Sequence, residues 1–219
     1  MANNFLRLAS DDHATLASRP RLSFTAIQGL PPAWQHRDIG AVTIPGQAST
    51  LGASDALTYV VSGDGANIGG TADAFHFVHQ DASGARTFTA RLDAIESLPP
   101  QPKAGLMIRA STAPDAKNLF LGLSPTGGLV FHRRDFTGGG TTHVVNPLTA
   151  LRPPLWLRLR REANLTTFTA FYSTDGVTWS PPLGTIELPG LPETLSYGLA
   201  VSSRSPGQTA TAAFSQVGL

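Results

Sequence analysis

Short segments of alternating apolar and polar residues follow one another along most of this chain, and turn-forming residues separate them. Strand candidates recur about every 8–14 residues, with Gly, Pro, Asp or Asn between them. No segment carries an apolar repeat of 3.6 residues over three helical turns. This spacing is typical of sandwiches and jelly rolls, so the sequence predicts an all-β fold, a two-sheet antiparallel jelly-roll sandwich.

Alternation within the strand candidates assigns side chains to faces. In Leu155–Arg161 the three leucines share one face, which predicts that Trp156 and Arg158 point away from the core. In Ala104–Ala110 the same rule places Arg109 on the face opposite the leucine and isoleucine. The full set of candidates is Ala56–Ser62, Ala74–Gln80, Arg86–Ile95, Ala104–Ala110, Asn118–Ser124, Gly128–Arg134, Thr141–Val145, Leu155–Arg161, Thr166–Ser173, Leu183–Leu188, Ser196–Ser203 and Thr209–Val217.

Composition excludes several classes of site and partner. The 219 residues include no Cys, which excludes disulfides, thiolate zinc sites and cysteine nucleophiles. The net charge of +1 gives no reason to expect a nucleic acid partner. No apolar run approaches the roughly 20 residues of a membrane-spanning helix. We therefore expect no nucleic acid partner and no membrane span, and we also expect the module to be monomeric.

The first part of the chain differs from the rest. Residues 1–33 are expected to form an N-terminal arm, or the remnant of a preceding β domain, plus a linker. Two short extended candidates, Asn4–Leu8 and Pro20–Thr25, cannot bury a core of their own. Gly29-Leu30-Pro31-Pro32 indicates a boundary, because two prolines preclude a helix and interrupt a strand ladder. Residues 34–219 are then expected to form the sandwich domain.

Eight motifs, in this order, carry a resemblance to a known family. They are W-Q-H-R-D-I-G at Trp34–Gly40, the whole stretch Ser62–Gln80, T-A-R-L at Thr89–Leu92, K-A-G-L-M-I-R-A at Lys103–Ala110, F-H-R-R at Phe131–Arg134, P-L-W-L-R-L-R-R at Pro154–Arg161, Y-S-T-D-G-V-T-W at Tyr172–Trp179 and Y-G-L-A-V-S-S at Tyr197–Ser203. Residues 34–219 thereby resemble a recurring bacterial module of the concanavalin A-like lectin/glucanase superfamily. Residues 10–25 resemble the closing strands of a bacterial carbohydrate-binding jelly-roll domain.

The resemblance implies a sandwich with a concave face, in multidomain exported proteins. We therefore expect a non-catalytic carbohydrate-binding module that attaches a larger protein to a polysaccharide or glycan. The N-terminal residues lack the apolar segment of a signal peptide, so we expect an extracellular or cell-surface piece of a longer chain. Two alternatives stay open: a structural or adhesive spacer without a ligand, and a glycoside hydrolase or lyase.

This chain departs from the family pattern at three positions. Members commonly read D-I-W where this chain has Asn67, Ile68 and Gly69, so a carboxylate and an aromatic ring are missing there. The last strand has Ser215 where an aspartate is usual. Any function that relatives place on the D-I-W pair is therefore in doubt here.

Trp156 is the main candidate for a sugar platform. An outward tryptophan flanked by arginine suits stacking on a sugar ring and hydrogen bonding to its hydroxyls. Arg109, Arg158, His76 and Gln80 are expected to add polar contacts if their strands are neighbours in the concave sheet. The alternative is that a loop or the N-terminal arm covers Trp156.

A catalytic centre is not expected. Glycoside hydrolysis needs two carboxyls roughly 5–10 Å apart, and none of the four glutamates has a second carboxylate two or four positions away on a strand. His76 and His79 form H-x-x-H. On a strand these two side chains point to opposite faces and are not expected to share a zinc ion, so the expectation is an exposed His76 and a partly buried His79.

Two turn-rich stretches suggest a metal site and a braced hairpin. Asp64, Asn67 and Asp73 are candidate oxygen ligands for a structural calcium ion, although Asx turns account for the same residues. Ser173–Trp179 resembles an Asp-box hairpin, in which the aspartate braces the turn through backbone N–H groups. The Asp175-Gly176 pair independently predicts a tight turn there.

Overall fold

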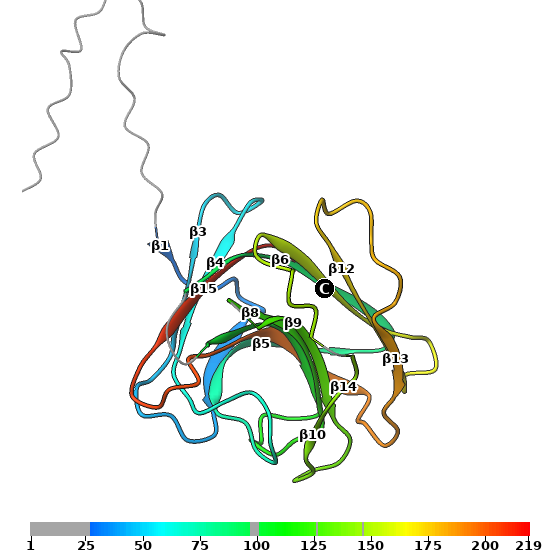
Figure 1. Cartoon of the computed structure of the whole chain (residues 1–219). Helices are drawn as coiled ribbons and strands as arrows, with labels where there is room; N and C mark the ends of the chain where they lie inside the picture. The colour runs from blue at the N-terminus through cyan, green and yellow to red at the C-terminus, as the bar shows by residue number, and fades with distance from the viewer. Residues whose placement is uncertain (1–26, 97–100, 126, 146) are drawn as a thin grey trace, which may run out of the picture.

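The structure is a computed structural model that describes residues 27–96, 101–125, 127–145 and 147–219. These residues form two antiparallel sheets that lie face to face (Figure 1). The predicted all-β, two-sheet antiparallel jelly-roll sandwich is confirmed. Within the described ranges, no helix is long and apolar enough to cross a membrane.

Each sheet is built from strands that are far apart in the sequence. The larger sheet has the order β1 (Ile27–Gln28), β3 (Gln47–Leu51), β4 (Thr58–Gly63), β15 (Ala210–Gly218), β6 (Arg86–Ile95), β11 (Leu155–Arg161), β12 (Thr167–Ser173) and β13 (Gly184–Glu187). The smaller sheet has the order β10 (Thr141–His143), β9 (Gly128–Arg134), β8 (Asn118–Ser124), β7 (Lys103–Arg109), β14 (Thr194–Ser202), β5 (Phe75–Ser83) and β2 (Gln35–Ile39). Figure 1 shows the smaller sheet curving around a concave side that faces away from the larger sheet.

The main core lies between the sheets and follows the two-residue period of the strands. On β11, Leu155, Leu157 and Leu159 are at most 1% exposed, whereas the residues between them point outward. Trp34 packs on this core, with its ring 5.3 Å from Tyr59. The alternation rule therefore placed the inner face of this strand correctly.

Three strands, β1, β2 and β3, were missing from the sequence prediction. β2 lies at an edge of the smaller sheet and pairs only with β5, so most of its residues face solvent and show no apolar alternation. β1 pairs with β3 at the edge of the larger sheet, which joins residues 27–28 to the sandwich. The predicted extended segments Asn4–Leu8 and Pro20–Thr25 lie outside the described residues.

The hairpin after β12 has the predicted Asp-box geometry. Oδ1 of Asp175 accepts hydrogen bonds from the backbone N–H groups of Val177 at 2.8 Å and Thr178 at 2.7 Å. Gly176 has φ of +77°, a left-handed conformation that glycine adopts without strain. The carboxylate therefore braces the turn.

These donors give a prediction for acid titration. Hydrogen bonds from Val177 and Thr178 stabilise the ionised form and lower the pKa of Asp175 to about 2. Because this pKa is lower in the folded state than in the unfolded chain, the ionised carboxylate stabilises the folded protein above about pH 4. This stabilisation is lost as the pH falls through about 2. A ¹³C NMR titration of the carboxyl carbon should show this low midpoint; an ordinary midpoint near 3.9 would disprove the bracing role.

Candidate functional site

The five predicted sugar-binding residues lie on three different surfaces. Trp156 and Arg158 point outward from β11 in the larger sheet. Arg109 points from β7 to the concave side of the smaller sheet, whereas His76 and Gln80 point from β5 toward the side of the main core. The structure therefore does not bring these residues together as one site, and that hypothesis is corrected.

Trp156 is half-buried, and its polar atom is already satisfied. Nε1 donates a hydrogen bond to Oε1 of Gln216 at 2.9 Å. The guanidinium of Arg91 lies 4.8 Å from the ring centroid. Gly176 approaches so closely that a Cβ there would lie 2.8 Å from the indole. This tryptophan therefore joins strands and hairpin by packing, and the alternative that a loop covers it is favoured over a sugar platform.

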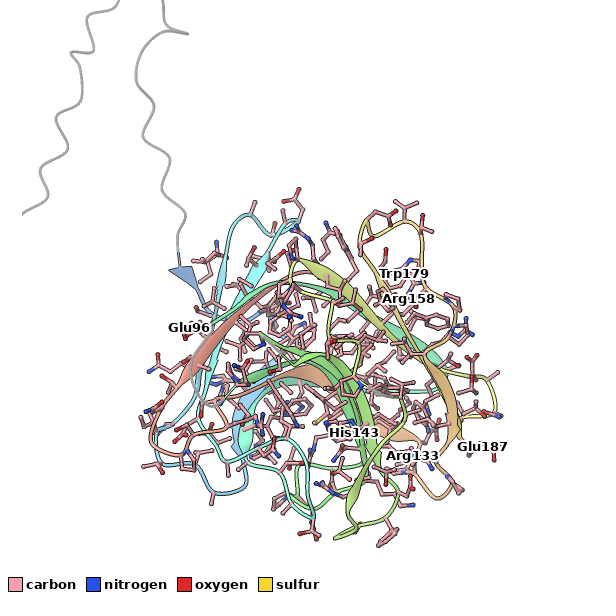
Figure 2. All side chains as sticks on the ribbon, viewed as in Figure 1. Glu96, Arg133, His143, Arg158, Trp179 and Glu187 are labelled. Atoms are coloured by element: carbon pink, nitrogen blue, oxygen red, sulfur yellow. The ribbon has the colours of Figure 1, made fainter. Side chains whose placement is uncertain are left out.

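Arg158 also has a structural partner. Its guanidinium carbon lies 3.4 Å from the ring centroid of Trp179, and Figure 2 shows the two side chains together beside the Asp-box hairpin. Burial lowers the pKa of Arg158, and the neighbouring Arg160 lowers it further. The cation–π contact ties the hairpin to β11.

His76 is buried, although the sequence suggested exposure. It is 1% exposed, and Nδ1 lies 2.7 Å from Oδ1 of Asp38. Its Nε2 lies 3.1 Å from Nδ1 of His36. Both partners are on β2, so His76 fastens this edge strand to β5. His79 points to the other side of β5, as expected for an H-x-x-H pair on a strand.

Asp73 is the centre of a buried charge network on the concave side, which we call the Asp73 network (Asp73, Arg109, Arg134 and Asn118). Arg134 binds both carboxylate oxygens at 2.8 Å, and Arg109 donates from Nη1 at 2.7 Å. Nδ2 of Asn118 donates at 3.0 Å. The three charged side chains are at most 1% exposed. Arg109 is therefore held by a carboxylate and is not available to a ligand.

Asp64 has a separate set of partners. Its carboxylate accepts hydrogen bonds from the backbone N–H groups of Thr43, Ile44, Gly65 and Gly207. Burial alone would raise the pKa of Asp64, but these N–H donors outweigh burial and lower it. The side chain therefore ties three loops together.

These contacts correct the calcium hypothesis. A calcium ion needs carboxylate and carbonyl oxygens that converge without competing donors. Asp64 and Asp73 are instead surrounded by N–H groups and guanidiniums, and the backbone carbonyl of Asn67 accepts from Ala74 at 2.8 Å. No group of three or more His, Cys, Asp or Glu that could hold a metal ion occurs in the described part of the chain.

Much of the concave side is covered. The segment between β4 and β5 folds over it and places Ile68 in a second apolar cluster, in which every side chain is at most 6% exposed. The cluster contains Ile39, Ile68, Phe75, Phe77, Met107, Phe120, Val130 and Ala200. The Asp73 network anchors this cover, because Arg134 also donates to the carbonyl oxygen of Gly70 at 3.1 Å. A long open groove is therefore not present over the centre of the sheet.

His132 lies on the same side and gives a pH prediction. It is 1% exposed, and neither ring nitrogen has a hydrogen-bond partner among the described residues. Burial holds the pKa of His132 well below its usual 6.5, and the charges of Lys103 and His143 add to this effect. Below about pH 6.5 the unfolded chain binds a proton that the folded protein does not, so stability should fall as the pH falls.

The variant His132→Phe should reduce this acid sensitivity. Urea unfolding at neutral and at mildly acidic pH measures the loss for both proteins. Phenylalanine cannot titrate and suits the position, because His132 packs 5.1 Å from the ring of Phe120. An equal loss of stability in the variant and the natural protein would show that His132 is not the titrating group.

One part of the concave side stays open, and we call it the polar pocket. It has a volume of about 340 Å³. β2, β5, β14 and the segment after β7 supply its walls. The lining residues are Gln35, Arg37, His79, Asp81, Ala110, Ser111, Thr112, Thr194 and Ser196. The pocket is therefore lined by hydroxyl, amide, imidazole, guanidinium and carboxylate groups in a small volume.

His79 forms the buried floor of the polar pocket. It is 4% exposed, and its ring stacks on Phe77 with centroids 4.9 Å apart and planes 12° apart. Its Nδ1 is buried, has no hydrogen-bond partner in the described structure and lies 3.7 Å from Oδ1 of Asp81. Burial lowers the pKa of His79, which favours the neutral ring with one donor and one acceptor nitrogen.

The other polar groups are held at the two ends of the pocket. Asp81 accepts a hydrogen bond from Oγ of Ser196 at 2.6 Å, yet its side chain is 57% exposed. Arg37 donates to Oγ1 of Thr112 at 3.0 Å. A fixed carboxylate at one end and a fixed guanidinium at the other suit a ligand with many hydroxyl groups.

Sequence reasoning missed the polar pocket for two reasons. Arg37 and Gln35 belong to β2, which the pattern did not identify as a strand. His79 and Asp81 share a face of β5, but only the three-dimensional pairing with Ser196 on β14 shows that this face is concave. The H-x-x-H motif was the one available signal, because its second histidine, His79, lines the pocket. From the sequence alone, this motif was considered only as a metal site.

A larger cavity, of about 520 Å³, lies at the end of β4 and β15. Its lining mixes Leu57, Tyr59 and Val217 with the carboxylate of Asp55. The polar pocket contains a buried polar atom without a hydrogen-bond partner among the described residues, Nδ1 of His79. The described lining of the larger cavity contains no such atom. The polar pocket is therefore the stronger candidate.

Paired catalytic carboxylates are not found in the polar pocket. Asp81 is the single carboxylate among the described lining residues. Figure 2 shows Glu96 and Glu187 on opposite sides of the molecule. The two-carboxylate geometry of glycoside hydrolysis is not present at this site.

Comparisons with known proteins show the fold. No family model matches the chain, and no curated protein sequence matches it. A functionally unknown protein from Saccharomyces cerevisiae matches with a TM-score of 0.61 and 18% identity, over 79% of this chain and 94% of that protein. A GH43 protein from Bacillus licheniformis matches with a TM-score of 0.52 and 15% identity, over 90% of this chain and 40% of that one. Basic winged bean lectin, in a structure with Tn-antigen, matches with a TM-score of 0.44 and 10% identity.

Proposed function

We propose that this protein is a non-catalytic carbohydrate-binding module and that the polar pocket is its ligand site. The observation that carries the proposal is the pocket's lining, where hydroxyl, amide, imidazole, carboxylate and guanidinium groups surround one small volume. Sugars present closely spaced hydroxyl groups that both donate and accept hydrogen bonds, which these side chains match. The single carboxylate favours binding over hydrolysis.

Retention on immobilised polysaccharides and a glycan panel tests this proposal. The protein should be retained by a subset of glycans, and free sugar should elute it. The glycans should emerge from the incubation uncleaved. Absence of retention across a broad panel would contradict the proposal, and release of shortened products would favour the hydrolase or lyase alternative.

The spacer alternative has one observation in its favour. A spacer without a ligand needs no open concave face, and the segment carrying Ile68 covers the centre of that face. A spacer should show no glycan retention and no change of thermal stability with added sugars. A ligand site should instead raise the melting temperature as sugar concentration rises.

The proposal includes the setting of the module. We propose that it acts as a monomer, outside the cell or at its surface, within a longer chain. The sequence resemblance to modules of exported proteins supports this setting. Size-exclusion chromatography coupled to light scattering tests the monomer, and fractionation of the source cells tests the location.

A further inference from the structure

On β5 and β14, the concave side changes from open to covered between one residue and the next residue on the same face. On β5, His79 lines the polar pocket, and Phe77, the next residue on that face, is 0% exposed. On β14, Ser196 lines the pocket, and Gly198 after it is buried. Successive residues on one face of a strand are about 7 Å apart. The floor of the pocket therefore ends abruptly toward the centre of the sheet.

A rigid wall stands beside the pocket. It consists of Ala110–Thr112, the segment after β7. Arg109 fixes this segment, because its Nε donates to the carbonyl oxygen of Ser111 at 3.1 Å and its Nη2 to that of Ala113 at 2.6 Å. Arg37 joins the wall through its 3.0 Å bond to Thr112. The Asp73 network thereby holds both the cover over the sheet and the wall of the pocket.

The opposite end is open. Asp81 and Thr194 are exposed there, and Oγ1 of Thr194 lies 2.7 Å from Oγ of Ser83 at the rim. No apolar cluster covers these residues in the described structure. A ligand can therefore enter past Asp81, but it cannot continue over Phe77 without displacing buried side chains.

The pocket is also small. Its volume of about 340 Å³ lies at the lower end of the roughly 300–1,000 Å³ found for small-molecule sites. A sugar chain that ran across the sheet would need a longer groove. The floor is the ring of His79, which is 4% exposed and whose Nδ1 lies 3.7 Å from Oδ1 of Asp81, so the exposed Asp81 carboxylate is the group that a sugar hydroxyl meets first.

We propose that the polar pocket recognises the terminal residue of a glycan and not an internal stretch of the chain. This inference rests on the proposed carbohydrate-binding function. The terminal sugar enters past Asp81, its hydroxyls bond to the exposed Asp81 carboxylate above the His79 ring, and the wall stops it from passing through. The rest of the glycan leaves the pocket into solvent and contributes few contacts.

Recognition of a terminal sugar and recognition of internal sugars differ in how affinity depends on glycan length and on the number of chain ends. The probes are cello-, xylo- and chito-oligosaccharides from dimers to hexamers, together with polysaccharides that the protein retains. Affinity per mole of chain should change less than about threefold across an oligosaccharide series that binds. Partial acid hydrolysis of a retained polysaccharide creates new chain ends at constant sugar mass. The hydrolysed polysaccharide, added as a soluble competitor, should inhibit retention on the immobilised polysaccharide more strongly per unit mass, in proportion to the number of ends.

Two results would overturn the inference in different ways. Affinity that rises about tenfold or more with chain length, with no gain from new ends, would mean that internal residues are bound and would leave the carbohydrate-binding proposal intact. No binding to any glycan would overturn the proposed function itself. In a matched pair, Asp81→Ala should weaken binding to the new ends about ten- to hundredfold, and Asp135→Ala, on the segment after β9, should bind them as the natural protein does.

Discussion

Replacing Asp73 by asparagine should destabilise the protein by about 3–5 kcal/mol, because removing one partner of a buried ion pair leaves uncompensated buried charge. The carboxylate bonds both Arg109 and Arg134, and all three charged side chains are at most 1% exposed. An amide of the same shape retains some hydrogen bonding but leaves two guanidiniums together without an anion. Urea unfolding measures the loss directly.

The matched control is Asp135→Asn. Asp135 pairs with Arg133 at 3.0 Å, but both side chains are partly exposed, so the loss should be less than about 1 kcal/mol. If Asp73→Asn were as mild as this control, the Asp73 network would not be what holds the covering segment on the sheet. If Asp73→Asn does not fold at all, Arg109→Met tests the same network from another partner and should also lose stability.

The second large effect concerns binding. Asp81→Ala should weaken glycan binding about ten- to hundredfold, because a hydrogen bond to a charged group contributes roughly 1.5–3 kcal/mol. The side chain is 57% exposed, and its described contacts are the hydrogen bond from Ser196 and the 3.7 Å approach to Nδ1 of His79, so the fold should be little affected. Isothermal titration with a retained glycan measures the affinity, and circular dichroism checks the fold.

Trp156→Ala is the informative counterpart. The structure places this tryptophan on the outer face of the larger sheet, bonded to Gln216. We expect glycan affinity to change less than about twofold while the melting temperature falls, because a half-buried aromatic ring is lost. Loss of binding in Trp156→Ala with normal binding in Asp81→Ala would move the site back to the tryptophan.

The fold was predictable because strand alternation and turn residues are local. Leu155, Leu157 and Leu159 are separated by polar or amphipathic residues, and turn signals such as Asp175-Gly176 mark the ends of strands. The edge strand β2 was not predictable in this way, because a strand with one neighbour and a solvated face shows no apolar period. Its position depends on pairing with β5, and this pairing is a long-range contact.

The candidate site was less predictable for a related reason. Alternation assigns Trp156 and Arg109 to outer faces of their own strands, but it does not say which sheet each strand joins. It therefore grouped residues from opposite sides of the sandwich. The role of Asp73 could not be predicted for the same reason. Asp, Asn and Gly in a loop suggest turns or a metal site, whereas the contacts of its carboxylate with Arg109 and Arg134 are long-range contacts that only the fold creates.

We expect the polar pocket to bind the glycan. ¹H–¹⁵N NMR spectra recorded during titration with a retained glycan test this expectation most directly. The largest chemical-shift changes should map to His79, Asp81 and Ser196, with little change at Trp156 and Arg158. Changes centred on Trp156 and Arg158, or no changes with any glycan, would contradict it.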